Sequence, residues 1–134
     1  MPVTVNLNSA LPQNWGIDIP CRAAENLTLG NIVFLTQSGG NWHANQSNGV
    51  TDPGFAGVAL ATVASGASVR VKVQGIAVVS TSLSGLSGAA QNLPLAPAAA
   101  GACAPRSTSL TPALGTVWSL ANNQIKLNGW GPHA

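Results

Sequence analysis

Charged residues are scarce in this chain of 134 residues, since Asp, Glu, Lys and Arg together make up 6% of it, against about 25% in ordinary soluble proteins. The side-chain carboxylates are those of Asp18, Glu25 and Asp52, which leaves little material for acid–base catalysis or for a cage of oxygen ligands around a metal ion. The basic residues are scattered, whereas a nucleic-acid site needs a dense basic stripe. We therefore expect no enzymatic activity, no cofactor, no metal and no nucleic-acid partner.

The marks of a secreted or membrane protein are missing as well. Residues 1–5 have neither the basic nor the apolar region of a signal peptide. No uninterrupted apolar run approaches the ~18 residues of a membrane span. The sequence therefore predicts synthesis in a cytoplasm and no membrane partner.

The two cysteines, Cys21 and Cys103, lie far apart in the sequence, in no CxxC pair and without histidine at ligand spacing. This spacing argues against a zinc site. Two small, buried, apolar side chains are the simplest interpretation. A disulfide would require the two residues to approach each other, which the sequence does not determine, so both alternatives stay open at this point.

Helical periodicity is also absent, because no long stretch repeats apolar side chains at the helical period. The segment from Ala96 to Pro105 is rich in alanine, but prolines interrupt it, and each proline removes a backbone donor. At most one short helical turn fits between Pro97 and Gly101. The chain is therefore expected to be nearly all β.

The clearest pattern that is present is a strict alternation of apolar and polar residues from 69 to 74. Such alternation places three valines on one face of a strand and the polar residues, Arg70, Lys72 and Gln74, on the other. Gly75 then interrupts the pattern before a second β-branched run at residues 76–79. We expect a half-buried strand followed by a bulge or a sharp bend.

Further strands are expected upstream of this one. Residues 31–36 form a short apolar run, and residues 38–41 carry two glycines that suit a hairpin turn into Trp42. Residues 55–61 read as another buried strand, which a tight turn at Ser65 and Gly66 joins to the alternating strand.

The second half of the chain echoes the first. Residues 93–95 correspond to residues 33–35, residues 113–118 to residues 55–60, and residues 124–129 to residues 70–75. This gives repeat halves at 27–79 and 90–129 and raises an internal duplication as one explanation. The predicted fold is all-β: a small β-barrel or β-sandwich in one domain, 15–134, preceded by an extended N-terminal arm, 1–14.

The order of residues 29–33, 55–60 and 65–75 resembles a family of small phage capsid decoration proteins, also called cement proteins. In that family a G-D-x-V strand entry, a G-V-A-L strand and a V-x-V-x-G strand recur, often in two copies; this chain has Asn31 in place of the family's Asp. The resemblance implies an all-β fold, a homo-oligomer on the outer capsid face and no catalysis. Expected partners are the lattice of the major capsid protein and further copies of this chain, as a trimer rather than a dimer. Such a protein is made in the host cytoplasm and resides in the virion.

Candidate interface residues come from both ends of the chain. In the arm, Val3, Val5 and Leu7 alternate with polar residues, so the arm could add to the sheet edge of a neighbouring subunit or form an edge strand of its own barrel. Trp15 and Trp130 lie in loop-like surroundings and are expected to anchor contacts with partner proteins, in which Trp is enriched.

A second hypothesis is a receptor- or glycan-binding module of a phage fibre or spike. Trp15, Trp42 or Trp130 would then form a platform for a sugar ring, with Asn and Gln amides nearby. Trp118, inside an apolar strand, is expected in the core. A hydrolase using His43 is a third and weaker alternative, because no motif supplies its Ser and Asp partners.

Overall fold

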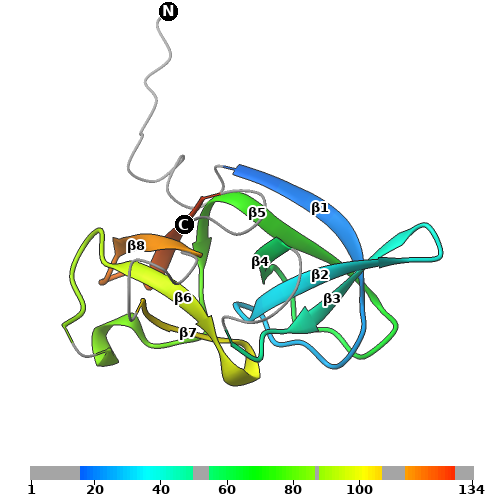
Figure 1. The fold of residues 1–134 in the computed structure, drawn as a ribbon, viewed down its shortest axis with the longest axis horizontal. Helices are drawn as coiled ribbons and strands as arrows, with labels where there is room; N and C mark the ends of the chain where they lie inside the picture. The colour runs from blue at the N-terminus through cyan, green and yellow to red at the C-terminus, as the bar shows by residue number, and fades with distance from the viewer. Residues whose placement is uncertain (1–15, 50–54, 87, 107–113, 129–134) are drawn as a thin grey trace, which may run out of the picture.

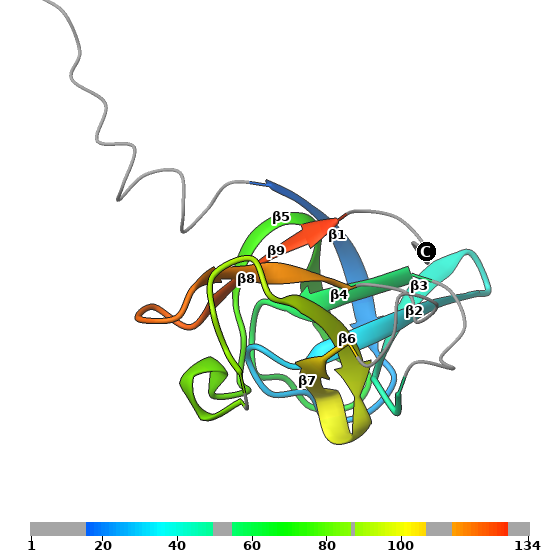
Figure 2. The same ribbon diagram turned by 60° about the vertical axis from the view of Figure 1, so that its left-hand side comes forward.

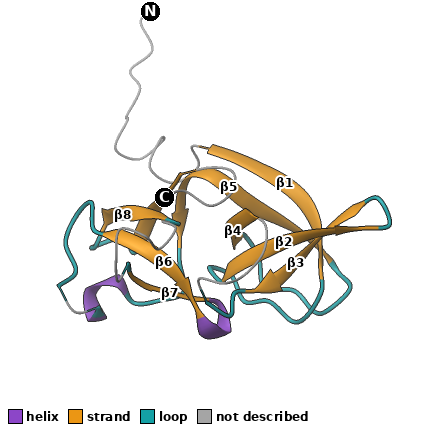
Figure 3. Cartoon of the chain, viewed as in Figure 1, coloured by secondary structure: helices purple, strands orange, loops and turns teal. Residues whose placement is uncertain are grey.

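The computed structural model describes residues 16–49, 55–86, 88–106 and 114–128, and this part of the chain is nearly all β (Figure 3). Two short 3-10 turns, η1 (Leu83–Gly85) and η2 (Ala99–Gly101), are the helical elements within it. The prediction of an all-β chain is confirmed. The strands are β1 (Gly16–Ala23), β2 (Ile32–Ser38), β3 (Asn41–Gln46), β4 (Phe55–Ala59), β5 (Ser68–Val78), β6 (Pro94–Ala98), β7 (Ala102–Pro105), β8 (Gly115–Ser119) and β9 (Gln124–Asn128).

The first five strands close into a barrel in the order β1-β3-β2-β4-β5, because β1 pairs both with β3 and with β5 (Figure 1). The β1–β3 pairing is parallel and short, whereas the other pairings of the barrel are antiparallel. The remaining strands continue from β5 in the order β9-β8-β6-β7 (Figure 2). We call the first five strands the barrel and the last four the second sheet.

The second sheet repeats the pairing pattern of the barrel. β2 pairs with β3 and β4, and β4 pairs with β5; in the same way β6 pairs with β7 and β8, and β8 pairs with β9. The registers agree as well. Val58 opposes Lys72 between β4 and β5, and Thr116 opposes Lys126 between β8 and β9. These are the residues that the sequence echo placed in corresponding positions.

At one strand the predicted correspondence was wrong by two residues. Val33 of β2 opposes Gly57, and the residue that opposes the matching Gly115 is Leu95, not Leu93. A shift of two residues keeps every side chain on the same face of a strand. The alternation of side chains therefore could not distinguish the two alignments.

Strand β5 belongs to both parts of the fold. Residues 68–75 pair with β1, and residues 74–78 pair with β9. The end of β5 therefore takes the position beside β9 that β1 takes beside β5 in the barrel. Gly75, at this transition, has φ of +108°, a conformation that glycine adopts at no steric cost. The strand continues through Gly75. The register shifts between the pairs Ile17–Gln74 and Asp18–Lys72, so the expected bulge lies in β5 two residues before Gly75.

The buried apolar residues form two separate groups: one consists of residues from the first half of the chain, and the other combines residues of the second sheet and the end of β5 with Ile32 and Val58 of the barrel. Matching positions of the repeat supply both groups. Ala44 and Val71 belong to the first, and their counterparts Cys103 and Ile125 belong to the second. The second core also includes Ile32 and Val58, so the barrel contributes to both cores.

Both cysteines are buried and free, and each belongs to a different core. A disulfide between Cys21 and Cys103 is therefore excluded, and the interpretation of two small, buried side chains is confirmed.

The alternating strand is only partly as predicted. Val69, Val71 and Val73 are buried and Arg70 is exposed, as expected, but Lys72 is buried too, at 5% exposure. Lys72 stands opposite residues of both neighbouring strands, β1 and β4, which cover its long aliphatic stem. The sequence pattern of one strand does not show how much of each side chain the neighbouring strands cover.

The proline-rich segment forms a hairpin, β6–β7, although the sequence predicted strand character only for residues 93–95. Pro105 lies in β7, which is an edge strand, where a missing donor is tolerated. Pro97 lies in β6 beyond the two residues, Pro94 and Leu95, that pair with β8. Between the two strands, η2 supplies the single helical turn that was expected.

Buried polar groups join the barrel to the second sheet. Ser47 is 1% exposed, and its hydroxyl donates to the carbonyl oxygen of Ala98 in β6. The N–H of Gly101 donates in turn to the carbonyl oxygen of Ser47, at 3.2 Å. The side chain of Asn31 lies beside Gly101, and its amide nitrogen is 3.4 Å from the hydroxyl oxygen of Ser80.

Replacing Ser47 with alanine is expected to lower the free energy of unfolding by about 1–2 kcal/mol, because a buried carbonyl loses its donor. Urea unfolding followed by tryptophan fluorescence measures this loss. The exposed Ser38, at the end of β2, gives the control Ser38→Ala, whose effect should be negligible. Equal stability of the two variants would contradict the role of Ser47 in the joint.

Candidate binding site at the open end of the barrel

A pocket of about 400 Å³ lies where β1 and β3 separate. These strands pair only at Arg22 with His43 and at Ala23 with Ala44, whereas β1 stays paired with β5 from Gly16 onward. The wall of the barrel is therefore open beside the first part of β1. The volume falls within the ~300–1,000 Å³ of small-molecule sites. The lining residues are Pro20, Cys21, Arg22, Asn41, Trp42, Ser68, Val69 and Arg70.

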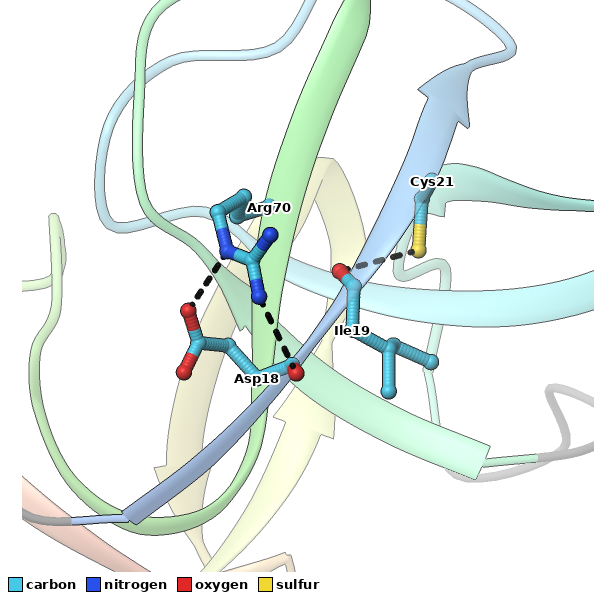
Figure 4. A network of polar contacts seen from close by, with 4 residues as sticks. All are labelled: Asp18, Ile19, Cys21 and Arg70. Atoms are coloured by element: carbon cyan, nitrogen blue, oxygen red, sulfur yellow. Dashed lines mark hydrogen bonds and ion pairs between the residues drawn. The ribbon is translucent and has the colours of Figure 1, made fainter.

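Two guanidinium groups define the charge of this pocket. The Nε of Arg70 donates to the Oδ2 of Asp18 at 2.8 Å, and its Nη2 lies 3.5 Å from the backbone oxygen of Asp18 (Figure 4). The Nη1 of Arg22 donates to the carbonyl oxygen of Gly66 at 3.1 Å, and Arg22 forms no ion pair with a described carboxylate. Asp18 therefore forms an ion pair with Arg70, and Arg22 leaves a positive charge uncompensated within the described part of the chain.

The inner side of the pocket is apolar. Cys21 and Val69 belong to the barrel core, and the half-buried Trp42 packs against that core. The Sγ of Cys21 lies 3.7 Å from the carbonyl oxygen of Ile19 (Figure 4). Burial raises the pKa of the Cys21 thiol from 9.0 to about 11, and the positive charge of Arg70 lowers it by less. The Cys21 thiol is therefore protonated at neutral pH and forms part of the apolar side of the pocket.

The raised pKa of Cys21 predicts a loss of stability at alkaline pH. A protonated thiol is favoured in the folded protein, so its contribution is complete below pH 9.0 and is lost as the pH rises toward about 11. Free energies of unfolding across this range should fall less steeply for Cys21→Ala than for the unmodified chain. Parallel curves for the two proteins would contradict the assignment.

The residues predicted as interface anchors all lie outside the described residues. This holds for Val3, Val5 and Leu7 of the arm and for Trp15 and Trp130; their role stays a prediction.

Two of the other aromatic and histidine predictions can be compared with the structure. Trp118 lies in β8 but is only half-buried, because the register shifts between Val117 and Ser119; the expectation of a core position was wrong, and Val117 is the buried residue there. His43 is half-buried in β3.

Within the described ranges, no group of three or more His, Cys, Asp or Glu side chains could hold a metal ion. None of the helices described is long and apolar enough to cross a bilayer.

Sequence reasoning singled out Trp42 but missed Arg22, Asn41 and Arg70 as its neighbours. The pocket combines residues of three strands, and β1 was not predicted as a strand. No linear motif signals such a site, because it depends on the closure of the barrel.

No protein-family model matches the chain, and no curated protein matches its sequence. Among solved structures, its fold is similar to that of the head fiber gp8.5 N base of bacteriophage phi29. The two share 14% sequence identity with a TM-score of 0.58, and the match covers 87% of this chain and 98% of the phage chain. At this level of identity the match shows a common fold.

Proposed function

We propose that this chain is a structural protein of a phage virion that binds the outer face of the assembled capsid and stabilises the shell. The observation that carries the proposal is the fold shared with the base of a phage head fiber over 98% of that chain. The resemblance of residues 29–33, 55–60 and 65–75 to capsid decoration proteins supports it independently of the fold.

The composition supports a mechanical role rather than a catalytic one. Charged residues make up 6% of the chain, so few charges hold copies or partners apart. Ile17, Leu29 and Val78 are large apolar residues that stay about half exposed in the described part of the chain. Apolar contact contributes ~25 cal/mol per Å², and the symmetry of a shell multiplies a modest affinity per copy.

The proposal includes assembly with other copies of this chain, as a homotrimer in preference to a dimer. Val3, Val5 and Leu7 of the arm would add to a neighbour's sheet edge, and Trp15 and Trp130 would fill apolar hollows of the partner. Sedimentation velocity of the purified chain gives the number of copies directly, and a strict monomer would contradict this part.

Co-sedimentation with mature, undecorated phage capsids tests the proposal. We expect stoichiometric binding to intact shells, none to dissociated capsid subunits, and little change between low and high salt, because so few charges are available to be screened. Trp15→Ser and Trp130→Ser should weaken binding. Lys126→Gln, which changes an exposed residue of β9, is the control and should bind normally. Absence of binding to shells at both salt concentrations would overturn the proposal.

A further inference from the structure

The second sheet offers an internal comparison for the pocket of the barrel. Because the registers repeat, each pocket residue has a counterpart in the second sheet. Cys21 opposes Val69 in the barrel. In the same way the N–H of Val79 donates to the carbonyl oxygen of Asn123, so Val79 is the counterpart of Cys21 and Asn123 is the counterpart of Val69. Continuing the same registers, the counterparts of Arg22, Trp42 and Arg70 are Ser80, Gly101 and Gln124.

At the matching place in the second sheet, the polar Asn123 stands where the barrel has the apolar Val69. The amide nitrogen of Asn123 donates to the carbonyl oxygens of Val79 and Thr81. A Cβ on Gly101 would lie 2.9 Å from the side chain of Asn31, so a larger residue there would require Asn31 to move. The fold therefore does not require a tryptophan or an arginine at this place.

The barrel differs from the second sheet in charge as well as in shape. Gln124 is 2% exposed, whereas the side chain of its counterpart Arg70 is 60% exposed. Two of the five basic residues of the chain, Arg22 and Arg70, line this one pocket, and Asp18 compensates only Arg70. Arg22, which pairs with no described carboxylate, and Trp42 thus line the same pocket, an arrangement that suits a negatively charged ligand.

We propose that this pocket binds a sugar ring that carries a carboxylate or a phosphate group. Trp42 would pack against the ring, since aromatic faces suit the apolar side of a pyranose. Arg22 would bind the acidic group through charge-assisted hydrogen bonds, for which the guanidinium is suited.

The remaining residues of the pocket fit the same ligand. Asn41 and Ser68 provide donors and acceptors for hydroxyl groups. Asp18 holds Arg70 in place through the Nε contact, which orients the rest of that guanidinium. The inner wall of Cys21 and Val69 is apolar and uncharged, as in most small-molecule sites.

Two arginines are too few to hold a nucleic-acid backbone, so a single acidic sugar residue is the ligand that the pocket fits best. The proposal goes beyond capsid attachment and does not depend on it.

Saturation-transfer NMR with the full chain tests the proposal. The probes are galacturonate, glucuronate and galactose 6-phosphate, with neutral galactose and glucose as their matched controls. We expect saturable binding of acidic sugars at least tenfold tighter than that of the neutral parents. Added salt should weaken it, because a partly exposed ion pair is screened. The carboxylate and phosphate probes distinguish the two sources of negative charge.

Variants locate the site. Arg22→Gln and Trp42→Ala should each weaken binding of the acidic probe at least tenfold, and Trp42→Phe should recover part of the loss. Lys126→Gln removes the same charge from an exposed position outside the pocket and should leave binding unchanged. Equal binding of acidic and neutral sugars, no binding of any probe, or full binding by Arg22→Gln would each overturn the proposal. Capsid co-sedimentation of Arg22→Gln should stay normal, which separates this site from the proposed attachment to the shell.

Discussion

Replacing Gly115 with alanine is expected to lower the free energy of unfolding by roughly 3 kcal/mol or more, because the new Cβ would overlap the backbone carbonyl oxygen of Lys126 in the neighbouring strand. A backbone atom inside a paired sheet cannot move aside as a flexible side chain can. Gly57 is its counterpart in the barrel, and a Cβ there would lie 2.6 Å from a methyl group of Val71 and 2.7 Å from the carbonyl oxygen of Lys72. Gly57→Ala should therefore be destabilising as well, but less so.

Urea unfolding of the alanine variants gives the comparison. Gly85→Ala is the matched control, because the nearest atom to its Cβ is the Ser82 hydroxyl oxygen at 3.5 Å, an ordinary contact. The expected order of destabilisation is Gly115→Ala, then Gly57→Ala, then Gly85→Ala. If Gly115→Ala yields no folded protein, the difference between Gly57→Ala and Gly85→Ala still tests the argument. Stabilities equal to that of Gly85→Ala would show that the strands separate easily at these positions.

Much of the strand pattern could be predicted from the sequence, because it depends on neighbours along the chain. The alternation from Val69 to Gln74 predicted a strand with three buried valines. The glycines at 39 and 40 predicted the β2–β3 hairpin, which the structure confirms. Turn chemistry and side-chain period are local properties, and here they were sufficient.

Closure of the sheet into a barrel could not be predicted in the same way. It depends on β1, whose apolar residues Ile17, Ile19, Cys21 and Ala23 do alternate with other residues, but Pro20 interrupts the run and it was not predicted as a strand. The parallel contact of Arg22 with His43 joins strands that are not consecutive, and no local signal encodes such a pairing. The sequence therefore left both a barrel and a sandwich open, and the structure shows a closed barrel with additional strands.

The candidate site was predictable only in part for the same reason. Trp42 stood out as an aromatic residue after a hairpin turn, but Arg22 and Arg70 appeared as two scattered basic residues. They come together because β1 pairs with β5 on one side and leaves β3 on the other. The apolar and polar pattern also misplaced Lys72, since it describes one strand and not the strands beside it.

Replacing Asn123 with alanine is expected to lower the free energy of unfolding by about 4 kcal/mol. Its side-chain oxygen accepts the N–H of Leu83 at 2.8 Å, and its nitrogen donates to the carbonyl oxygens of Val79 and Thr81. Each of these hydrogen bonds contributes about 1 kcal/mol. Asn123 also has φ of +56°, and alanine in this left-handed conformation costs about 1 kcal/mol more.

The control variant is Asn92→Ala, because Asn92 has φ of +68° but an exposed side chain. It carries the backbone cost without the loss of three buried hydrogen bonds, so it should be destabilised by about 1 kcal/mol. The difference between the two variants, measured by urea unfolding, is the contribution of the Asn123 amide. A difference near zero would mean that Val79, Thr81 and Leu83 are held by other contacts. A difference of about 3 kcal/mol would show that the three hydrogen bonds of the Asn123 amide each contribute about 1 kcal/mol to stability.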